Sequence, residues 1–190
     1  MKLPPTLLAP ALALGLFGAT VTAAQKPIAT FDAQAINMDA PSGQVTGSVQ
    51  IQISRWSTDA EADQLRTVLL EQGEKKLLDL VSKMPPVGSI RTPDTVGYRL
   101  RYARQTKIGT STRVVIVTDR PVSFWERRDG GRTIDYPFTV IELRVAPNGR
   151  GEGKISAVTR ITADKVTKEV QMDNYTIAPV LLQNVRRDMH

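Results

Sequence analysis

Four carboxylates in the middle of the chain are the residues best suited to acid–base chemistry. Hydrolysis of a glycoside uses two carboxyl groups, one as the acid and the other as the nucleophile or base, across the scissile bond. Arginines lie close in sequence, and ion pairing with them is the alternative role. We favour ion pairing and assign no catalytic residue. The candidates for catalysis are Asp119, Glu126, Asp135 and Glu142.

A second group of residues combines aromatic rings with positive charge, which suits an anionic or sugar-like ligand. Tyrosines and arginines alternate over residues 98–104, and two further aromatic residues could stack on sugar rings. A half-exposed strand with tyrosines inward and arginines outward would show the same alternation without a ligand. We favour the half-exposed strand, and ligand binding is the alternative. The candidates for binding are Tyr98, Arg99, Arg101, Tyr102, Arg104, Trp125 and Tyr136.

The residue types that are missing exclude several kinds of active site. The chain has no cysteine, and its single histidine is the last residue, His190. Thiol catalysis, zinc clusters, disulfide frameworks and histidine-based triads are therefore excluded. The glycines between residues 149 and 153 lie between two expected strands, which predicts a hairpin rather than a phosphate-binding loop. We expect no metal site and no cofactor, and the balance favours a protein that is not an enzyme.

The first 24 residues have the organisation of a secretory signal peptide. Lys2 supplies a positive start, residues 7–21 are mostly apolar, and small residues occupy 22–24 before Gln25. The apolar run is short for a membrane span, which needs roughly 20 residues, and the mature chain should contain no transmembrane segment. The protein is therefore expected to be exported, to the periplasm or the extracellular space.

The composition indicates a single basic globular domain. Of 190 residues, 41% are hydrophobic and 23% charged, and the formal net charge is +6, a balance typical of folded domains. Because export removes the protein from nucleic acid, we expect no nucleic-acid partner. The partner is unknown, with an anionic component of the cell envelope as a candidate. We expect an irregular lead-in over residues 25–44 and one domain over residues 45–190.

Two helices are predicted near the beginning of this domain. Thr58 and Glu61 form a capping box, so a helix should start at Asp59. Gly73 supplies a stop, and a second apolar stripe ends at the prolines at 85–86. We therefore expect two short helices or one kinked helix.

The rest of the chain reads as strands joined by short turns. Residues 45–53 alternate apolar and polar side chains, which predicts a half-buried strand. The uninterrupted apolar run over residues 114–117 predicts a strand that is buried on both faces. The fold class is α+β, with a predominantly antiparallel sheet or meander of six to eight strands and the two helices on the N-terminal side. The pattern does not determine whether the sheet closes into a barrel.

Several segments resemble a set of exported bacterial hypothetical proteins of unassigned function. The resemblance covers most of the mature chain and implies export and a shared fold, but it carries no catalytic residue. The matching segments are residues 55–59 (RWSTD), 100–104 (LRYAR), 118–121 (TDRP), 124–126 (FWE), 135–139 (DYPFT) and 151–154 (GEGK).

Three functions are compatible with these observations. The leading hypothesis is a non-enzymatic binding or structural module of the envelope. The alternatives are a carboxylate-dependent hydrolase that acts on a glycan, and a carrier of a small apolar ligand. A carrier would require the sheet to enclose a cavity.

We predict that export removes residues 1–24, because the apolar stretch ends at Val21 and small residues precede Gln25. Intact-mass measurement of the secreted protein should give a chain that begins within a few residues of Gln25. A secreted species that still begins at Met1 would contradict the assignment.

Overall fold

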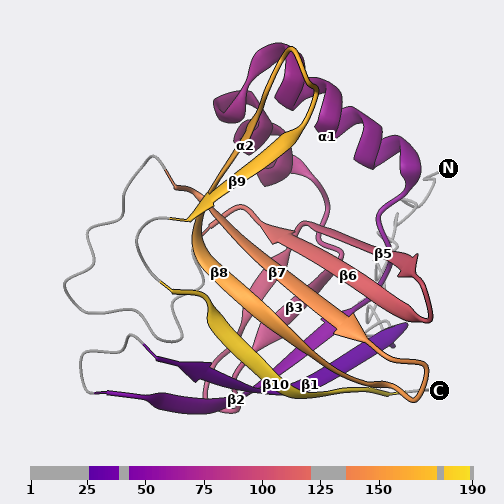
Figure 1. Ribbon diagram of the computed structural model, residues 1–190, viewed down its shortest axis with the longest axis vertical. Coiled ribbons are helices and arrows are strands. Elements are labelled where there is room, and N and C mark those ends of the chain that lie inside the picture. Colours follow the sequence, from indigo (N-terminus) through magenta and orange to yellow (C-terminus); the bar gives the residue numbers. More distant parts are fainter. Residues whose placement is uncertain (1–25, 39–42, 121–135, 175–177, 189–190) are drawn as a thin grey trace, which may run out of the picture.

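The structure is a computed structural model that describes residues 26–38, 43–120, 136–174 and 178–188. It has two helices and ten strands, which form one antiparallel sheet (Figure 1). In chain order the elements are β1 (Ala29–Asn37), β2 (Val45–Ile53), α1 (Asp59–Gln72), α2 (Glu74–Lys83), β3 (Gly88–Arg91), β4 (Tyr98–Leu100), β5 (Tyr102–Ile108), β6 (Ser111–Thr118), β7 (Phe138–Val145), β8 (Arg150–Ala163), β9 (Val170–Asn174) and β10 (Val180–Arg187).

The helices begin and end where the sequence predicts. The side chain of Thr58 accepts a hydrogen bond from the Glu61 amide, and the Glu61 carboxylate accepts one from the Thr58 amide, so the capping box is confirmed. Gly73 has a φ of 83° and separates α1 from α2, a backbone conformation that glycine adopts without steric cost. The chain therefore forms two helices rather than one kinked helix. Neither of these described helices is long and apolar enough to span a membrane.

The sheet curves so that the strands at its two ends, β4 and β5, are consecutive in the chain. The strand order is β4-β3-β2-β1-β10-β8-β7-β6-β5, and β9 extends from β8 alone. Only Arg101 separates β4 from β5, and its amide donates to the Val117 carbonyl of β6 at 3.0 Å. The sheet is therefore nearly closed and barrel-like, with the helices and β9 at one end (Figure 1).

The predominantly antiparallel sheet and the two helices are confirmed, but the prediction of six to eight strands is wrong. The ten strands include β1, which lies inside the segment 25–44 that the sequence indicates as irregular. Phe31, Ala33 and Ala35 alternate inward along β1, and β1 pairs with both β2 and β10. Alanine is a poor strand former, so this alternation is faint in the sequence. Pairing on both sides stabilises the strand.

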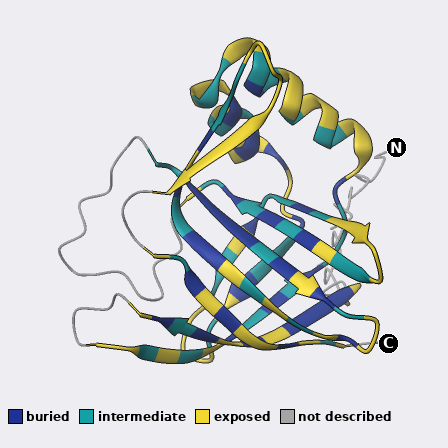
Figure 2. Ribbon diagram, viewed as in Figure 1, coloured by how far each residue is buried: buried dark blue, intermediate teal, exposed yellow. Residues whose placement is uncertain are grey.

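The space enclosed by the sheet is filled by side chains. Its cluster of buried residues includes Phe31, Ile51 and Leu100, each with no exposed surface. In Figure 2 buried and exposed residues alternate along the strands, as the period of a pleated strand requires. A ligand cannot occupy this interior without displacing core side chains.

The apolar run over residues 114–117 is explained by a second core outside the sheet. Val114 and Ile116 belong to the enclosed core, while Val115 and Val117 point the other way and pack against a second cluster. This second cluster joins Leu69, Leu77, Val81, Phe138, Val140 and Ile161. It fixes α1 and α2 on the outer face of β6, β7 and β8.

The glycine-rich stretch that follows β7 forms a hairpin, as the sequence predicts. Gly149 has a φ of 77° in the turn, and β8 begins at Arg150. A Cβ atom on Gly151 would lie 2.1 Å from the Arg144 carbonyl oxygen. The glycine therefore allows β8 to approach β7 closely.

We predict that Ile51→Asp lowers the free energy of unfolding by at least about 3 kcal/mol, because an unpaired carboxylate would enter the enclosed core. Thr46→Asp on the same strand is the control: Thr46 is exposed, and its substitution should change stability by no more than about 0.5 kcal/mol. Urea unfolding measures both. Equal midpoints for the two variants would contradict the direction of the β2 side chains.

Candidate functional site

An apolar groove lies between the two helices and the outer face of the sheet. Alternate residues of two neighbouring strands line it, Val115 and Val117 from β6 and Phe138 and Val140 from β7. These residues point away from the enclosed core because successive side chains of a strand face opposite sides. The groove is the part of the second core that protein side chains leave unfilled.

The lining of this groove is almost entirely apolar. The groove has a volume of about 230 Å³. Phe138 and Val140 are buried, whereas Val170 and Met172 of β9 are about half exposed. The groove is therefore open to solvent along β9. Its full lining consists of Ala62, Leu65, Arg66, Leu69, Leu77, Val81, Tyr102, Val115, Val117, Phe138, Val140, Ile161, Val170 and Met172.

Tyr102 and Arg66 supply the polar groups of this lining. Burial raises the pKa of the Tyr102 hydroxyl, although a side-chain hydrogen bond with Arg104 acts in the opposite direction. Arg104 itself forms an ion pair with Asp59, in which Nη2 lies 2.9 Å from Oδ1. Arg66 is exposed and has no ion pair among the described residues. The groove thus has apolar walls and one cationic side chain in its lining.

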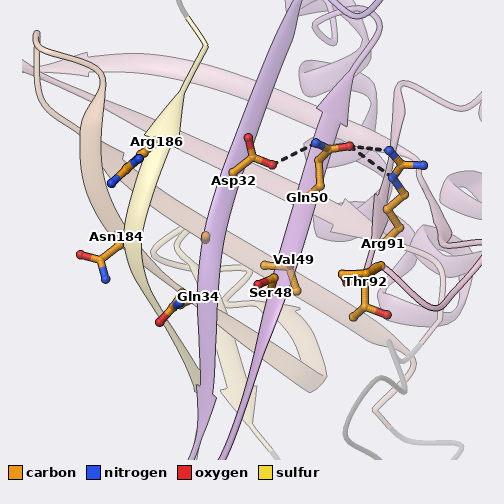
Figure 3. A pocket seen from close by; sticks show the side chains of 11 residues that line it. Asp32, Gln34, Ser48, Val49, Gln50, Arg91, Thr92, Asn184 and Arg186 are labelled. Carbon is orange, nitrogen blue, oxygen red and sulfur yellow. Dashed lines mark hydrogen bonds between the residues drawn. The ribbon is translucent and has the colours of Figure 1, made fainter.

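A second groove, on the outer face of β10, β1, β2 and β3, is lined mainly by polar and charged residues, and we call it the polar groove (Figure 3). It has a volume of about 700 Å³. Asp32, Gln50 and Arg91 form a hydrogen-bonded row across it, and Arg186 and Asn184 line it from β10. The sequence gives little sign of this groove, because its residues come from four strands that are far apart in the chain.

The structure does not bring the described candidate carboxylates together. Asp119 follows the end of β6, four residues beyond Val115, which lies opposite Glu142. Four residues of strand correspond to about 13 Å, more than the roughly 5 to 9.5 Å between the carboxyl groups of glycosidases. The other two candidates, Glu126 and Asp135, lie outside the described residues.

Each of these two carboxylates is held by basic side chains. Asp119 lies 3.4 Å from Arg101 and 3.7 Å from Arg120. Glu142 accepts a hydrogen bond from Arg113, and Lys154 Nζ lies 3.0 Å from its other oxygen. Burial acts to raise the pKa of Glu142, but these basic partners outweigh it and hold the pKa below its ordinary value. A general acid of the glycosidase kind needs a raised pKa instead.

The binding candidates of residues 98–104 are divided between the two faces of the sheet. Tyr98 packs against the enclosed core, and Arg99 is exposed. Arg101 is largely buried and ion-paired with Asp119. Tyr102 and Arg104 lie on the outer side, near the apolar groove.

The two remaining binding candidates lie elsewhere. The Tyr136 hydroxyl donates to the Asp173 carboxylate at 3.4 Å, and Trp125 lies outside the described residues. Of the six candidates that the structure describes, only Tyr102 lines the apolar groove. The sequence signals that point to this region are the apolar run at 114–117 and the apolar stripes of the helices, but the sequence alone does not distinguish the lining of a groove from core.

Comparison of the chain with protein-family models, curated proteins and solved structures finds no match in any of the three. Within the described ranges, no three histidine, cysteine, aspartate or glutamate side chains are grouped as a metal site would require.

We predict that Glu142→Gln lowers the free energy of unfolding by about 1 kcal/mol at pH 7, because it weakens the pairing with Arg113 and Lys154. The folded-state pKa of Glu142 is lowered. Its contribution to stability is therefore present above the unfolded-state pKa and is lost as pH falls through the folded-state value. Urea unfolding between pH 7 and pH 3 should show the wild-type advantage shrinking in acid.

The matched control is Glu152→Gln on β8, an exposed carboxylate with no ion pair among the described residues. It should change stability by no more than about 0.5 kcal/mol. A stability advantage of the wild type over Glu142→Gln that grows as the pH falls would contradict the assigned pairing.

Proposed function

We propose that the protein is an exported, non-enzymatic binding protein that holds a small apolar ligand in the groove between its helices and its sheet. The observation that carries this proposal is the lining of that groove, which is apolar apart from Arg66 and Tyr102 and is open to solvent along β9. Export rests on the signal-like first 24 residues and leads to the periplasm or the extracellular space.

Hydrophobic burial supplies the driving force. Transfer of a ligand from water to an apolar site is worth about 0.8 kcal/mol for each methylene group that is buried. The valine and leucine side chains of the groove are held in place by the second core. Because the walls are held in this way, little ordering free energy is lost when the ligand binds.

The size of the groove indicates the size of the ligand. Sites for drug-sized molecules have volumes of about 300 to 1,000 Å³, and an apolar cavity of about 150 Å³ is enough for one benzene ring. At about 230 Å³, the groove suits a short acyl chain or one to two rings. The ligand lies outside the barrel-like sheet, whose interior is filled, and so the carrier function does not need an enclosed cavity.

The hydrolase alternative has less support from the geometry. Asp119 and Glu142 lie about four residues of strand apart, and each is paired with basic side chains. Neither carboxylate lines the apolar groove. The structural role of these carboxylates is therefore the better interpretation.

The test uses the neutral fluorophore N-phenyl-1-naphthylamine, whose emission rises in an apolar site. We predict saturable binding by the mature protein, and binding at least 10-fold weaker in Ala62→Phe, because a phenyl ring would fill the groove from α1. Ala60→Phe is the matched control, since Ala60 is exposed on the same helix and is absent from the lining. The thermal midpoint and circular dichroism of both variants report on folding.

A second pair of variants covers the case in which the phenyl ring disturbs the second core. Met172 lines the groove and is about half exposed, so Met172→Asp should fold and should bind the fluorophore several-fold more weakly. Val166→Asp, in the exposed turn after β8, should leave binding unchanged. No saturable binding, or equal affinity in each pair, would refute the proposal.

A further inference from the structure

The polar groove on the outer face of β10, β1, β2 and β3 has the features of a second binding site. Antiparallel register places Arg186 of β10 opposite Asp32 of β1. Across the next two strand pairs, Gln50 lies opposite both Asp32 and Arg91. Four strands thus contribute one row of side chains with an arginine at each end (Figure 3).

Hydrogen bonds within this row orient Arg91. The Gln50 amide nitrogen donates to Asp32 Oδ1 at 2.9 Å, which turns its oxygen toward Arg91. That oxygen accepts from Nη2 of Arg91 at 2.7 Å and from its Nε at 3.2 Å. The partner of the guanidinium is therefore a neutral amide, so its positive charge is not cancelled.

The groove holds three charged side chains, Arg91, Arg186 and Asp32, so its positive charges outnumber its one negative charge. Among the described residues neither Arg91 nor Arg186 has a carboxylate within ion-pair distance. Their strands are separated by three inter-strand spacings, which is about 14 Å. One small anion cannot contact both guanidinium groups over that distance. An extended ligand with at least two negative charges can.

Four further lining residues suit hydroxyl groups, whereas Ala33, Val49 and Pro93 are apolar. Gln34, Ser48, Thr92 and Asn184 offer amide and hydroxyl groups, which both donate and accept hydrogen bonds. Asn184 has a φ of 51°, at the irregularity between Leu182 and Val185 where β10 departs from regular pairing. This irregular segment brings the Asn184 side chain into the lining of the groove.

We propose that this groove binds an acidic oligosaccharide, with carboxylates at Arg91 and Arg186 and sugar hydroxyls on Asp32, Gln50 and the amides and hydroxyls beside this row. The groove volume of about 700 Å³ lies within the range of ligand sites. Its lining has no aromatic ring on which a base could stack. It also has no large exposed apolar side chain that could enter a membrane. An acidic glycan therefore fits better than nucleic acid or a lipid surface.

The experiment is isothermal titration of the mature protein with an oligomer of galacturonic acid, compared with the methyl ester of the same oligomer. The acid should bind at least 10-fold more tightly than the neutral ester, and its affinity should fall as salt increases, because exposed charges are screened. Equal affinity for the acid and the ester would overturn the proposal, and so would no binding of the acid.

Variants locate the site. The double variant Arg91→Gln and Arg186→Gln should bind the acidic oligomer at least 10-fold more weakly than the wild type. Gln50→Ala removes the amide that orients Arg91, and it should weaken binding of the acidic oligomer about threefold. The control pair is Lys107→Gln and Arg144→Gln, which removes two exposed positive charges from β5 and β7. If the control pair weakens binding of the acidic oligomer as much as the double variant does, then net charge governs binding. That result would refute the site.

Two competing ligands complete the test. A single-stranded oligodeoxynucleotide of the same charge and vesicles that contain phosphatidylglycerol should bind at least 10-fold more weakly than the oligogalacturonate. Either competitor binding as tightly, with the same loss in the double variant, would overturn the choice of an acidic glycan. The groove residues do not line the apolar groove, so fluorophore binding should be unchanged in all these variants.

Discussion

The nearly closed sheet depends on one chain segment that pairs with two different strands. Residues 98–100 pair with β3 and residues 102–108 pair with β6, and Arg101 lies at the junction. Its guanidinium donates to the Met84 carbonyl at 2.8 Å and lies 3.4 Å from Asp119. The junction thereby connects the end of α2, the β4–β5 segment and the end of β6. Because both ends of the sheet meet here, the sheet surrounds the core almost completely.

The same junction explains why the molecule has two apolar clusters. In a regular strand, residues three positions apart face opposite sides of the sheet. Leu100 and Ala103 both face the enclosed core, so the alternation of inward and outward side chains shifts by one residue at the junction. Tyr102 is consequently placed on the outer side, in the lining of the apolar groove. The enclosed core is packed and supplies stability, while the outer cluster is incompletely filled. Space for an apolar ligand is therefore found outside the sheet, and the polar groove lies on other strands of the same outer surface.

Local sequence determined the elements whose stabilising contacts are local. The capping box of Thr58 and Glu61 and the left-handed Gly73 involve residues at most a few positions apart, so the limits of the helices were predicted correctly. The alternation over residues 45–53 predicted which β2 residues face the core. Short turns between apolar segments predicted an antiparallel sheet. In each case the physical cause lies within one element or one hairpin.

Only the tertiary structure decided features that depend on pairing between distant strands. The alanine-rich β1 is a strand because β2 and β10 lie on either side of it. The position of Tyr102 follows from the shift in this alternation at Arg101, which needs both β3 and β6. The polar groove gathers residues 32, 50, 91 and 186, which only the sheet order places side by side. Such contacts are set by the register between strands, and a one-dimensional pattern of side chains does not contain that register.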